Sequence, residues 1–452
     1  MPLSDLCVGR QRPRLGAAAT LKRFVPGPRR LSNLMSDLIK AVNSPDEIVR
    51  EAVGLRAVAL NKDLSPRAVL ELFERWAGAL QGNGMDSVPG APFLRLWLRQ
   101  GTLEPIIERE LGRDAMNGGW REEGRAKLRP FPVGTVGHWP AGNIEIQPVL
   151  SLTCALLGGN ACLVRVPSAL VDATQHLMDK LRTVDPDGIL TERISLISFD
   201  HSRDDLQAAM ARSVDGAMIW GREEAVSRIR ALPFPHWTRV AVFGPRLSVA
   251  AMDADVWNDP VERSAWCQRI ARDVWQFDQQ ACSSPQVLFL EQGAGGNVSQ
   301  FIDELRRAFE TENRVHPRLE IHPALTSAIC LARATWLLGD VANKAWFSQS
   351  PDWTILLGKG TDIPKPTQGR TLSVLVVEDL LEAVSKFDGA VQTLGLAVGN
   401  TQREDVLAQA AGRRGVDRIV KLGRMHVFAS PWDGVDLVRP MVRVVRHIPS
   451  QN

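Results

Sequence analysis

Short apolar runs that alternate with helical segments constrain the fold of this chain more than any other feature. Between residues 132 and 243, helical segments separate the strand-like runs. The predicted strands are one that begins at Pro132, then Ala161–Val166, Ile194–Ile197, Ala217–Trp220 and Arg239–Phe243. Parallel strands need crossover connections, which the helical segments supply, so the pattern predicts a doubly wound α/β sheet. Such a sheet can bind a nucleotide at the carboxyl ends of its strands, although this one has no G-x-G-x-x-G motif.

A second α/β region begins near residue 246. Its predicted strands are Val287–Leu290, Trp353–Leu357, Leu372–Val377 and Leu394–Val398, and a last strand covers Met441–Arg446. The chain has 452 residues, which is long for a single core, so we expect several parts. These are a basic, flexible extension at 1–35, a helical segment (31–111) plus a dinucleotide-binding α/β domain at 36–245, a catalytic α/β domain at 246–430, and a C-terminal strand segment at 431–452. The last strand would pack back on its own chain or pair with a second subunit, and a homo-oligomer is the expected assembly.

Composition excludes several classes of protein. The chain is 44% hydrophobic and 23% charged, as in an ordinary globular protein, and its net charge of +3 gives no reason to expect a nucleic-acid partner. No apolar run approaches the roughly 20 residues of a membrane span. The six cysteines lie far apart, without the paired spacing of a zinc site or a disulfide framework. We therefore expect no metal and a reducing, cytoplasmic location.

Cys282 is the leading candidate for a catalytic nucleophile. It lies in the segment Gln280-Ala281-Cys282-Ser283-Ser284-Pro285-Gln286, directly before the apolar run Val287–Leu290. A thiol at a loop-to-strand junction is accessible and rigidly held. Most single cysteines are nevertheless small buried residues, so this segment needs a second observation to support it.

That second observation is a glycine-containing loop about 140 residues earlier, Pro140-Ala141-Gly142-Asn143, with Gly159-Asn160, Arg165 and Gly221 following in order. This order, ending at Cys282, resembles the aldehyde dehydrogenase superfamily. The cysteine heptapeptide and the segment Pro431-Trp432-Asp433-Gly434 are similar to those of the bacterial luminescence-type long-chain acyl-CoA reductases. The resemblance implies an aldehyde dehydrogenase-like fold with two doubly wound α/β domains, for cofactor and catalysis, and a C-terminal bridging strand.

The resemblance also implies roles for individual residues. Cys282 matches the nucleophile, and Asn143 matches the asparagine whose amide forms the oxyanion hole with the backbone N–H at the cysteine. Arg165 matches a lysine that contacts the adenosine ribose, and Gly221 matches the glycine that lets a helix approach the pyrophosphate. The implied cofactor-binding residues are Pro140, Ala141, Arg165, Ser168, Trp220, Gly221 and Arg222.

Departures from the superfamily pattern indicate the direction of the reaction. The strand-end glutamate that activates water in hydrolytic members is replaced by Val242-Phe243-Gly244-Pro245. An acyl-enzyme protected from water suits reduction, because it must persist until hydride arrives. The ribose-binding acid after Arg165 is also missing, and the distal Glu-x-Phe-Gly-Pro motif has no clear match near Arg370.

We therefore expect an enzyme that reduces a fatty acyl-CoA or acyl-carrier thioester to an aldehyde, with a possible acyl-transferring partner enzyme. The alternatives are a CoA-acylating aldehyde dehydrogenase and an acyl-transfer or scaffold subunit. Arg165 without a nearby acid favours NADPH over NADH, because a guanidinium can pair with a 2′-phosphate. His138 is expected to be a structural histidine, with a proton shuttle as the alternative. Asp433-Gly434 is expected to be a turn, with a position at the edge of the site as the alternative.

Overall fold

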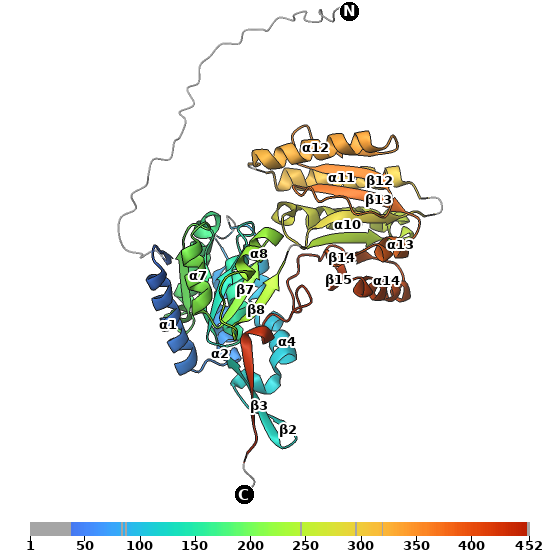
Figure 1. Ribbon diagram of the computed structural model, residues 1–452. Helices are drawn as coiled ribbons and strands as arrows, with labels where there is room; N and C mark the ends of the chain where they lie inside the picture. The colour runs from blue at the N-terminus through green and yellow to red at the C-terminus, as the bar shows by residue number, and fades with distance from the viewer. Residues whose placement is uncertain are drawn as a thin grey trace, which may run out of the picture. The chain divides into compact units, whose positions relative to one another are not determined.

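The computed structural model describes residues 38–82, 85, 88–244, 246–293, 296–318 and 320–449. The predicted basic extension at 1–35 lies outside these residues. Residues 38–452 form one compact unit (Figure 1). It contains a six-stranded sheet, a seven-stranded sheet and a small three-stranded sheet.

The six-stranded sheet has the order β1-β6-β5-β4-β7-β8, and all its neighbouring strands are parallel. Its strands are β1 (Ile39–Ala41), β4 (Thr135–Trp139), β5 (Ala161–Arg165), β6 (Ile194–Ser198), β7 (Gly216–Trp220) and β8 (Arg239–Phe243). The predicted parallel α/β sheet is confirmed. The helical prediction for 31–111 is wrong at β1, where Ile39 pairs with Leu196 at the sheet edge. A three-residue strand is too short to show a period in the sequence.

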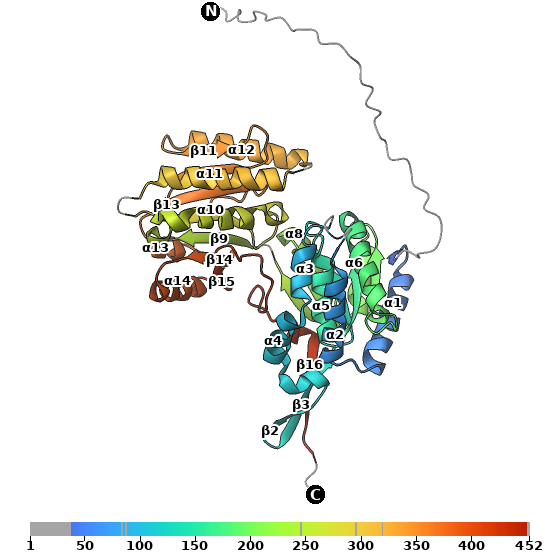
Figure 2. The ribbon, with the colours of Figure 1, turned by 180° about the vertical axis from the view of Figure 1, so that it is seen from behind.

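Helices cover both faces of this sheet (Figures 1 and 2). The helices of this half are α1 (Pro45–Asn61), α2 (Pro66–Ala79), α3 (Ala91–Trp97), α4 (Gln100–Leu111), α5 (Gln147–Leu157), α6 (Val171–Val184), α7 (Asp204–Ser213) and α8 (Glu223–Arg230), with short 3-10 turns at Arg113–Asn117, Ser168–Leu170 and Thr191–Arg193. Leu163 of β5 packs with α1 and α7, whereas its neighbours Cys162 and Val164 pack with α2, α5 and α6. Successive side chains of a strand point to opposite faces of the sheet, so β5 contributes to two separate cores.

The seven-stranded sheet has the order β11-β12-β13-β10-β9-β14-β15, and only β11 is antiparallel to its neighbour. Its strands are β9 (Leu247–Met252), β10 (Pro285–Glu291), β11 (Lys344–Phe347), β12 (Thr354–Lys359), β13 (Thr371–Val377), β14 (Val391–Ala397) and β15 (Arg418–Lys421). Its helices are α9 (Ala254–Asn258), α10 (Pro260–Trp275), α11 (Val298–Val315), α12 (Pro323–Gly339), α13 (Leu380–Ser385) and α14 (Thr401–Arg413), with 3-10 turns at Gln276–Gln279 and Arg439–Met441. Leu288 and Leu290 pack under α10 and α11, and Val287 and Phe289 face α13 and α14.

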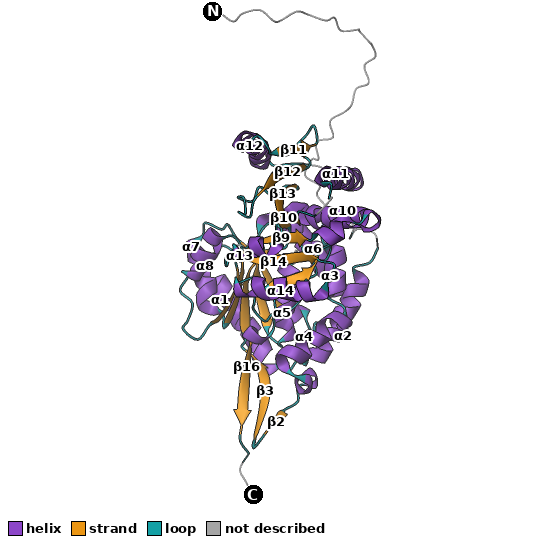
Figure 3. Cartoon of the chain, turned by 90° about the vertical axis from the view of Figure 1, so that its right-hand side faces the viewer, coloured by secondary structure: helices purple, strands orange, loops and turns teal. Residues whose placement is uncertain are grey.

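The C-terminal strand packs back on its own chain. Strand β16 (Val442–His447) runs antiparallel to β3 (Ala126–Pro132), which pairs in turn with β2 (Arg121–Glu123), as Figure 3 shows. The predicted homo-oligomer and the predicted domain boundaries stay predictions.

The segment before β16 is held by one buried carboxylate. Glu110 of α4 is 2% exposed and accepts hydrogen bonds from the backbone N–H groups of Leu437 (3.2 Å), Val438 (2.7 Å) and Arg439 (2.8 Å). The Ser430 hydroxyl donates to the same carboxylate. Residues 430–439 are therefore fixed to a helix more than three hundred positions earlier in the chain.

We predict that Glu110→Gln lowers the free energy of unfolding by about 2–4 kcal/mol, because its amide cannot accept these N–H groups as a carboxylate does. Chemical denaturation with a two-state fit measures the change. Glu108→Gln, on the same helix but paired only with Arg113 near the surface, is the control and should cost under about 0.5 kcal/mol. Equal losses in both variants would contradict the role of Glu110.

Candidate active site

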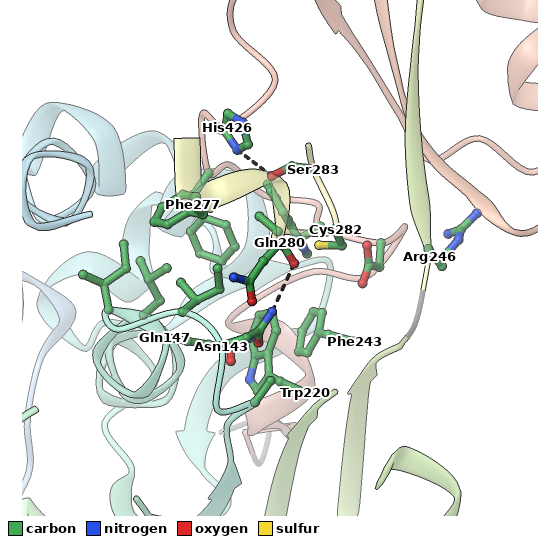
Figure 4. Close-up of a pocket in the computed structure, with 18 of the residues that line it drawn as sticks. Asn143, Gln147, Trp220, Phe243, Arg246, Phe277, Gln280, Cys282, Ser283 and His426 are labelled. Carbon is green, nitrogen blue, oxygen red and sulfur yellow. Dashed lines mark hydrogen bonds between the residues drawn. The ribbon is translucent and has the colours of Figure 1, made fainter. Parts of the chain in front are cut away.

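Residues from both α/β sheets line one cavity of about 500 Å³ (Figure 4). Ala141 and Asn143 reach it from the loop after β4, and Trp220 and Phe243 from the carboxyl ends of β7 and β8. Cys282 reaches it from the loop before β10. The two sequence segments predicted to act together thus line the same cavity.

An unusual left-handed turn precedes the cysteine. Phe277, Asp278 and Gln279 have φ values of 54°, 55° and 61°, a conformation that costs a non-glycine residue about 1–2 kcal/mol. The Asp278 carboxylate pairs with Arg318 (Nε to Oδ2, 2.8 Å) and with Arg370 (Nε to Oδ1, 2.6 Å). These ion pairs fix the turn.

The side chain of Gln279 ties the same turn to the sheet. It is fully buried, donates to the carbonyl oxygens of Pro285 and Thr371 (2.8 Å each), and accepts from the Thr371 N–H at 2.7 Å. Beyond it, the Ser248 hydroxyl of β9 donates to the Cys282 carbonyl at 2.6 Å. The backbone on both sides of the sulfur is therefore held rigidly.

The Cys282 side chain is partly exposed to the cavity but otherwise enclosed by protein atoms. Burial, together with repulsion by the nearby Asp433 carboxylate, raises the pKa of its thiol to about 12. A hydrogen bond from Gln392, the positive charge of Arg418 and the Ser283 N–H act in the opposite direction. The resting sulfur is a protonated thiol.

Asn143 lies beside the cysteine loop. Its side-chain nitrogen donates to the Gln280 carbonyl at 3.1 Å, two residues before Cys282 (Figure 4). An amide nitrogen carries two hydrogens, so one remains for a ligand in the cavity. The arrangement can supply a hydrogen bond to an oxygen that develops charge near the sulfur.

The residues expected at the cofactor divide into two groups. Ala141, Trp220, Gly221 and Arg222 line the cavity. The remaining residues, Pro140, Arg165 and Ser168, are not among its lining residues.

The expectation that no acid lies near Arg165 is wrong. Asp200 follows β6, the neighbour of β5, and its charge acts on Arg165. Burial lowers the pKa of Arg165, and Asp200 opposes this shift. The Arg165 guanidinium lies 5.2 Å from the Phe199 ring centre and donates to the Phe199 carbonyl at 3.4 Å.

Apolar side chains form most of the cavity wall, and apart from Ala141 and Trp220 they were not predicted as site residues. The rings of Trp220 and Phe243 stack with their centres 3.8 Å apart and an angle of 12° between them. Phe243 is the last residue of β8. Other apolar lining residues are Phe93, Leu96, Trp97, Ile144, Ile146, Phe277, Val427, Phe428 and Trp432. In contrast, the tryptophans Trp257, Trp266 and Trp275 lie in the core under the second sheet.

Two histidines lie near the cavity in different roles. His138 is fully buried and its Nδ1 bonds the Ser151 hydroxyl at 2.7 Å, so it is structural, as predicted. His426 lines the cavity, and its Nδ1 faces the Ser283 hydroxyl at 3.0 Å while Nε2 donates to the Asp273 carbonyl at 2.7 Å. Burial lowers the pKa of His426 to about 4, so the ring is neutral near pH 7. Nothing in the sequence around His426 indicated this position.

Comparison with known proteins places the chain in a family. The family model for acyl-CoA reductase (LuxC) matches residues 63–444. The chain belongs to the LuxC acyl-CoA reductase family. The predicted resemblance is confirmed, and the protein is an oxidoreductase of the acyl-thioester reductase class.

Curated LuxC-type relatives share a quarter of their residues with this chain. The long-chain acyl-protein thioester reductase 2 of Photobacterium leiognathi is 25% identical over 352 residues, which cover 76% of this chain and 70% of the relative. The long-chain acyl-protein thioester reductase of Vibrio harveyi is 24% identical over 356 residues, with the same coverage.

Solved structures confirm the aldehyde dehydrogenase-like fold. An NADP-dependent glyceraldehyde-3-phosphate dehydrogenase from Bacillus halodurans superposes with a TM-score of 0.67 at 14% identity, over 89% of this chain and 91% of that one. Aldehyde dehydrogenase 21 from Physcomitrella patens gives a TM-score of 0.64 at 14% identity and covers 90% of each chain. In the described part of the LuxC-family chain, no helix is both long and apolar enough to cross a membrane. Nor do the described residues include a cluster of ligating side chains suited to a metal ion.

Proposed function

We propose that this LuxC-family protein transfers the acyl group of a fatty acyl thioester to Cys282 and reduces it with NADPH to an aldehyde. The observation that supports the proposal best is the shared cavity, in which a thiol and a free amide hydrogen of Asn143 meet behind apolar walls. A thiol suits thioester exchange because the bonds made and broken are of similar strength.

The proposed chemistry proceeds in two stages. The Cys282 sulfur attacks the thioester carbonyl, and the tetrahedral oxyanion accepts hydrogen bonds from Asn143 and from the backbone N–H at the cysteine. The original thiol then leaves and an acyl-enzyme remains. A reduced nicotinamide dinucleotide, when bound, supplies the hydride that brings the acyl carbon to the aldehyde level. The Cys282 sulfur then departs and the aldehyde is released.

Phe243 and Trp220 protect the acyl-enzyme from hydrolysis in this proposal. Their stacked rings line the cavity at the carboxyl ends of β7 and β8, and neither ring carries a base that could activate water. The other aromatic and aliphatic residues of the wall suit an acyl chain, since such a wall leaves few polar groups to be desolvated. Relatives named acyl-protein thioester reductases support a protein-bound acyl donor, with coenzyme A as the other candidate. An acyl-transferring partner enzyme and a homo-oligomer complete the proposed assembly.

Several cavity residues fit a dinucleotide. Ala141 and Gly221 expose small side chains or backbone at the carboxyl ends of β4 and β7, where doubly wound sheets bind nucleotides. Trp220 offers a flat ring and Arg222 a charge. Pro140 adjoins Ala141 in the chain and Ser168 follows Arg165 by three residues, and both are proposed as supporting contacts. All the described cysteines are free, which agrees with the proposed reducing cytoplasm.

Replacing the nucleophile tests the reaction. Cys282→Ala should abolish both the acyl-enzyme, detected by intact mass after incubation with long-chain acyl thioesters, and aldehyde formation after NADPH is added. Cys330→Ala is the matched control, because Cys330 is an exposed cysteine on α12, and it should retain both activities. Aldehyde production by Cys282→Ala would rule the proposal out.

Asn143→Ala tests the oxyanion hole. Loss of one fixed donor should lower kcat by about 10²–10³-fold, because the donor acts on charge that develops in the transition state. Stopped-flow measurement of aldehyde formation at saturating thioester gives kcat. A rise in KM alone, with kcat unchanged, would show that Asn143 binds substrate without stabilising the transition state.

The choice of NADPH over NADH depends on Arg165. Arg165→Gln should raise the KM for NADPH about tenfold relative to that for NADH, because a charge-assisted pair with the 2′-phosphate is lost. Asp200→Asn, which removes the opposing carboxylate, should lower the KM for NADPH relative to the KM for NADH. If Arg165→Gln leaves the KM for NADPH unchanged relative to the KM for NADH, this assignment is contradicted.

A further inference from the structure

A rigid turn carries a carboxylate into the cavity of Cys282. Trp432 and Val435 exchange two backbone hydrogen bonds of 2.9 Å, and Asp433 between them has φ 51°. The Trp432 ring lies under the Arg418 guanidinium, 4.1 Å from its centre. Asp433 lines the same cavity as Cys282.

Gln392 at the start of β14 holds the carboxylate. It is fully buried, and its Nε2 donates to Asp433 Oδ1. Its side chain also acts to lower the pKa of the Cys282 thiol, which places it close to the sulfur. Its Oε1 has no hydrogen-bond partner within the described residues, and a buried acceptor left without a partner costs about 1–3 kcal/mol.

The other charged groups around Asp433 are largely occupied. Arg246 pairs with Asp417 and donates to the Val391 carbonyl at 2.9 Å. Arg418 donates to Thr393 Oγ1 (3.1 Å) and to the carbonyls of Met425 and Val427. Both guanidinium groups act on Asp433 through their charge, and neither forms a salt bridge with it among the described ion pairs.

We propose that Asp433 is the general base that accepts the thiol proton of Cys282 when the acyl group is transferred. The proposal rests on the proposed function and adds a catalytic residue to it. As the S–C bond to the acyl carbon forms, the proton passes from sulfur to an Asp433 oxygen. When the bond to the donor sulfur breaks, the proton passes from Asp433 to the leaving thiolate, so atoms and charge balance without another reactant.

The electrostatics agree with this geometry. Burial raises the pKa of Asp433 to about 6, against the hydrogen bond of Gln392 and the charges of Arg246 and Arg418. Near pH 7 the carboxylate is therefore ionised and can accept a proton. The thiol, with a pKa of about 12, is ionised in only about one molecule in 10⁵ at that pH, so acylation needs a base.

Alkylation of Cys282 separates this role from simple repulsion and needs no thioester. If Asp433 only repels the thiolate, Asp433→Asn removes the repulsion and makes iodoacetamide react faster. If Asp433 is the base, the alkylation rate of the wild type rises in one step as pH passes through about 6, where the carboxylate ionises. The variant then reacts at least about tenfold more slowly between pH 6.5 and 8 and does not show this step. Asparagine also tolerates the left-handed backbone, which keeps the turn intact. Site-specific labelling is read by peptide mass spectrometry.

Matched variants complete the design. Asp436→Asn, on the same loop but paired with Arg109, should behave like the wild type. Gln392→Leu, which removes a hydrogen bond that lowers the pKa of Asp433, should move the alkylation step to higher pH. Faster alkylation in Asp433→Asn, or an unmoved step in Gln392→Leu, would overturn the proposal. Near-ultraviolet circular dichroism of each variant reports an intact fold.

Acylation then tests the same residue with substrate. Asp433→Asn should slow formation of the Cys282 acyl-enzyme about 10²-fold, with hydride transfer from preformed acyl-enzyme unchanged. Acylation at the wild-type rate with slower hydrolysis of the acyl-enzyme would mean that Asp433 activates water, and would overturn the proposal. If the wild type forms no acyl-enzyme with any thioester, the proposed function fails, while the alkylation result still decides the role of Asp433.

Discussion

The ion pairs of Asp278 with Arg318 and Arg370 are the interaction on which the site depends. They hold three consecutive non-glycine residues in a left-handed turn, at a conformational cost of about 1–2 kcal/mol each. Both guanidinium side chains are at most 7% exposed, and leaving such charges unpaired costs about 3–5 kcal/mol. The turn sets the direction of the Gln280 carbonyl, to which Asn143 donates, and so joins the first sheet to the cysteine loop.

The cavity meets two opposing demands. An acyl chain and a short-lived acyl-enzyme favour apolar walls, which Trp220, Phe243 and Phe277 provide. The same walls make a thiolate costly, as the raised pKa of Cys282 shows. A neutral thiol paired with a carboxylate that is ionised at neutral pH would reconcile the two, because charge appears on sulfur only as the new bond forms. Arg418, itself tied to backbone carbonyls, limits the negative potential in this region.

The parallel sheets could be predicted from local patterns, and the meeting of Cys282 with the Asn143 loop from the resemblance to the aldehyde dehydrogenase superfamily. Strand β9 was not predicted because its alanines have a weak preference for strands. Its position is determined by pairing with β10 and β14. Asp200 could not be assigned to Arg165 because it follows the neighbouring strand β6, whose Ile197 pairs with Arg165. Asp433 lies far along the chain from Cys282, and its loop is brought back by long-range contacts such as those of Glu110 and Gln392.

The pairing of β16 with β3 has a consequence for synthesis. Translation delivers β3, α4 and the cysteine loop long before residues 430–447, so β3 is exposed as an unpaired edge while the rest of the chain is made. During that interval the carboxylate of Glu110 lacks its N–H partners, and the cavity lacks Trp432 and Asp433. The surroundings of the Cys282 sulfur are therefore incomplete until residues 430–447 have been made and have packed on β3 and α4.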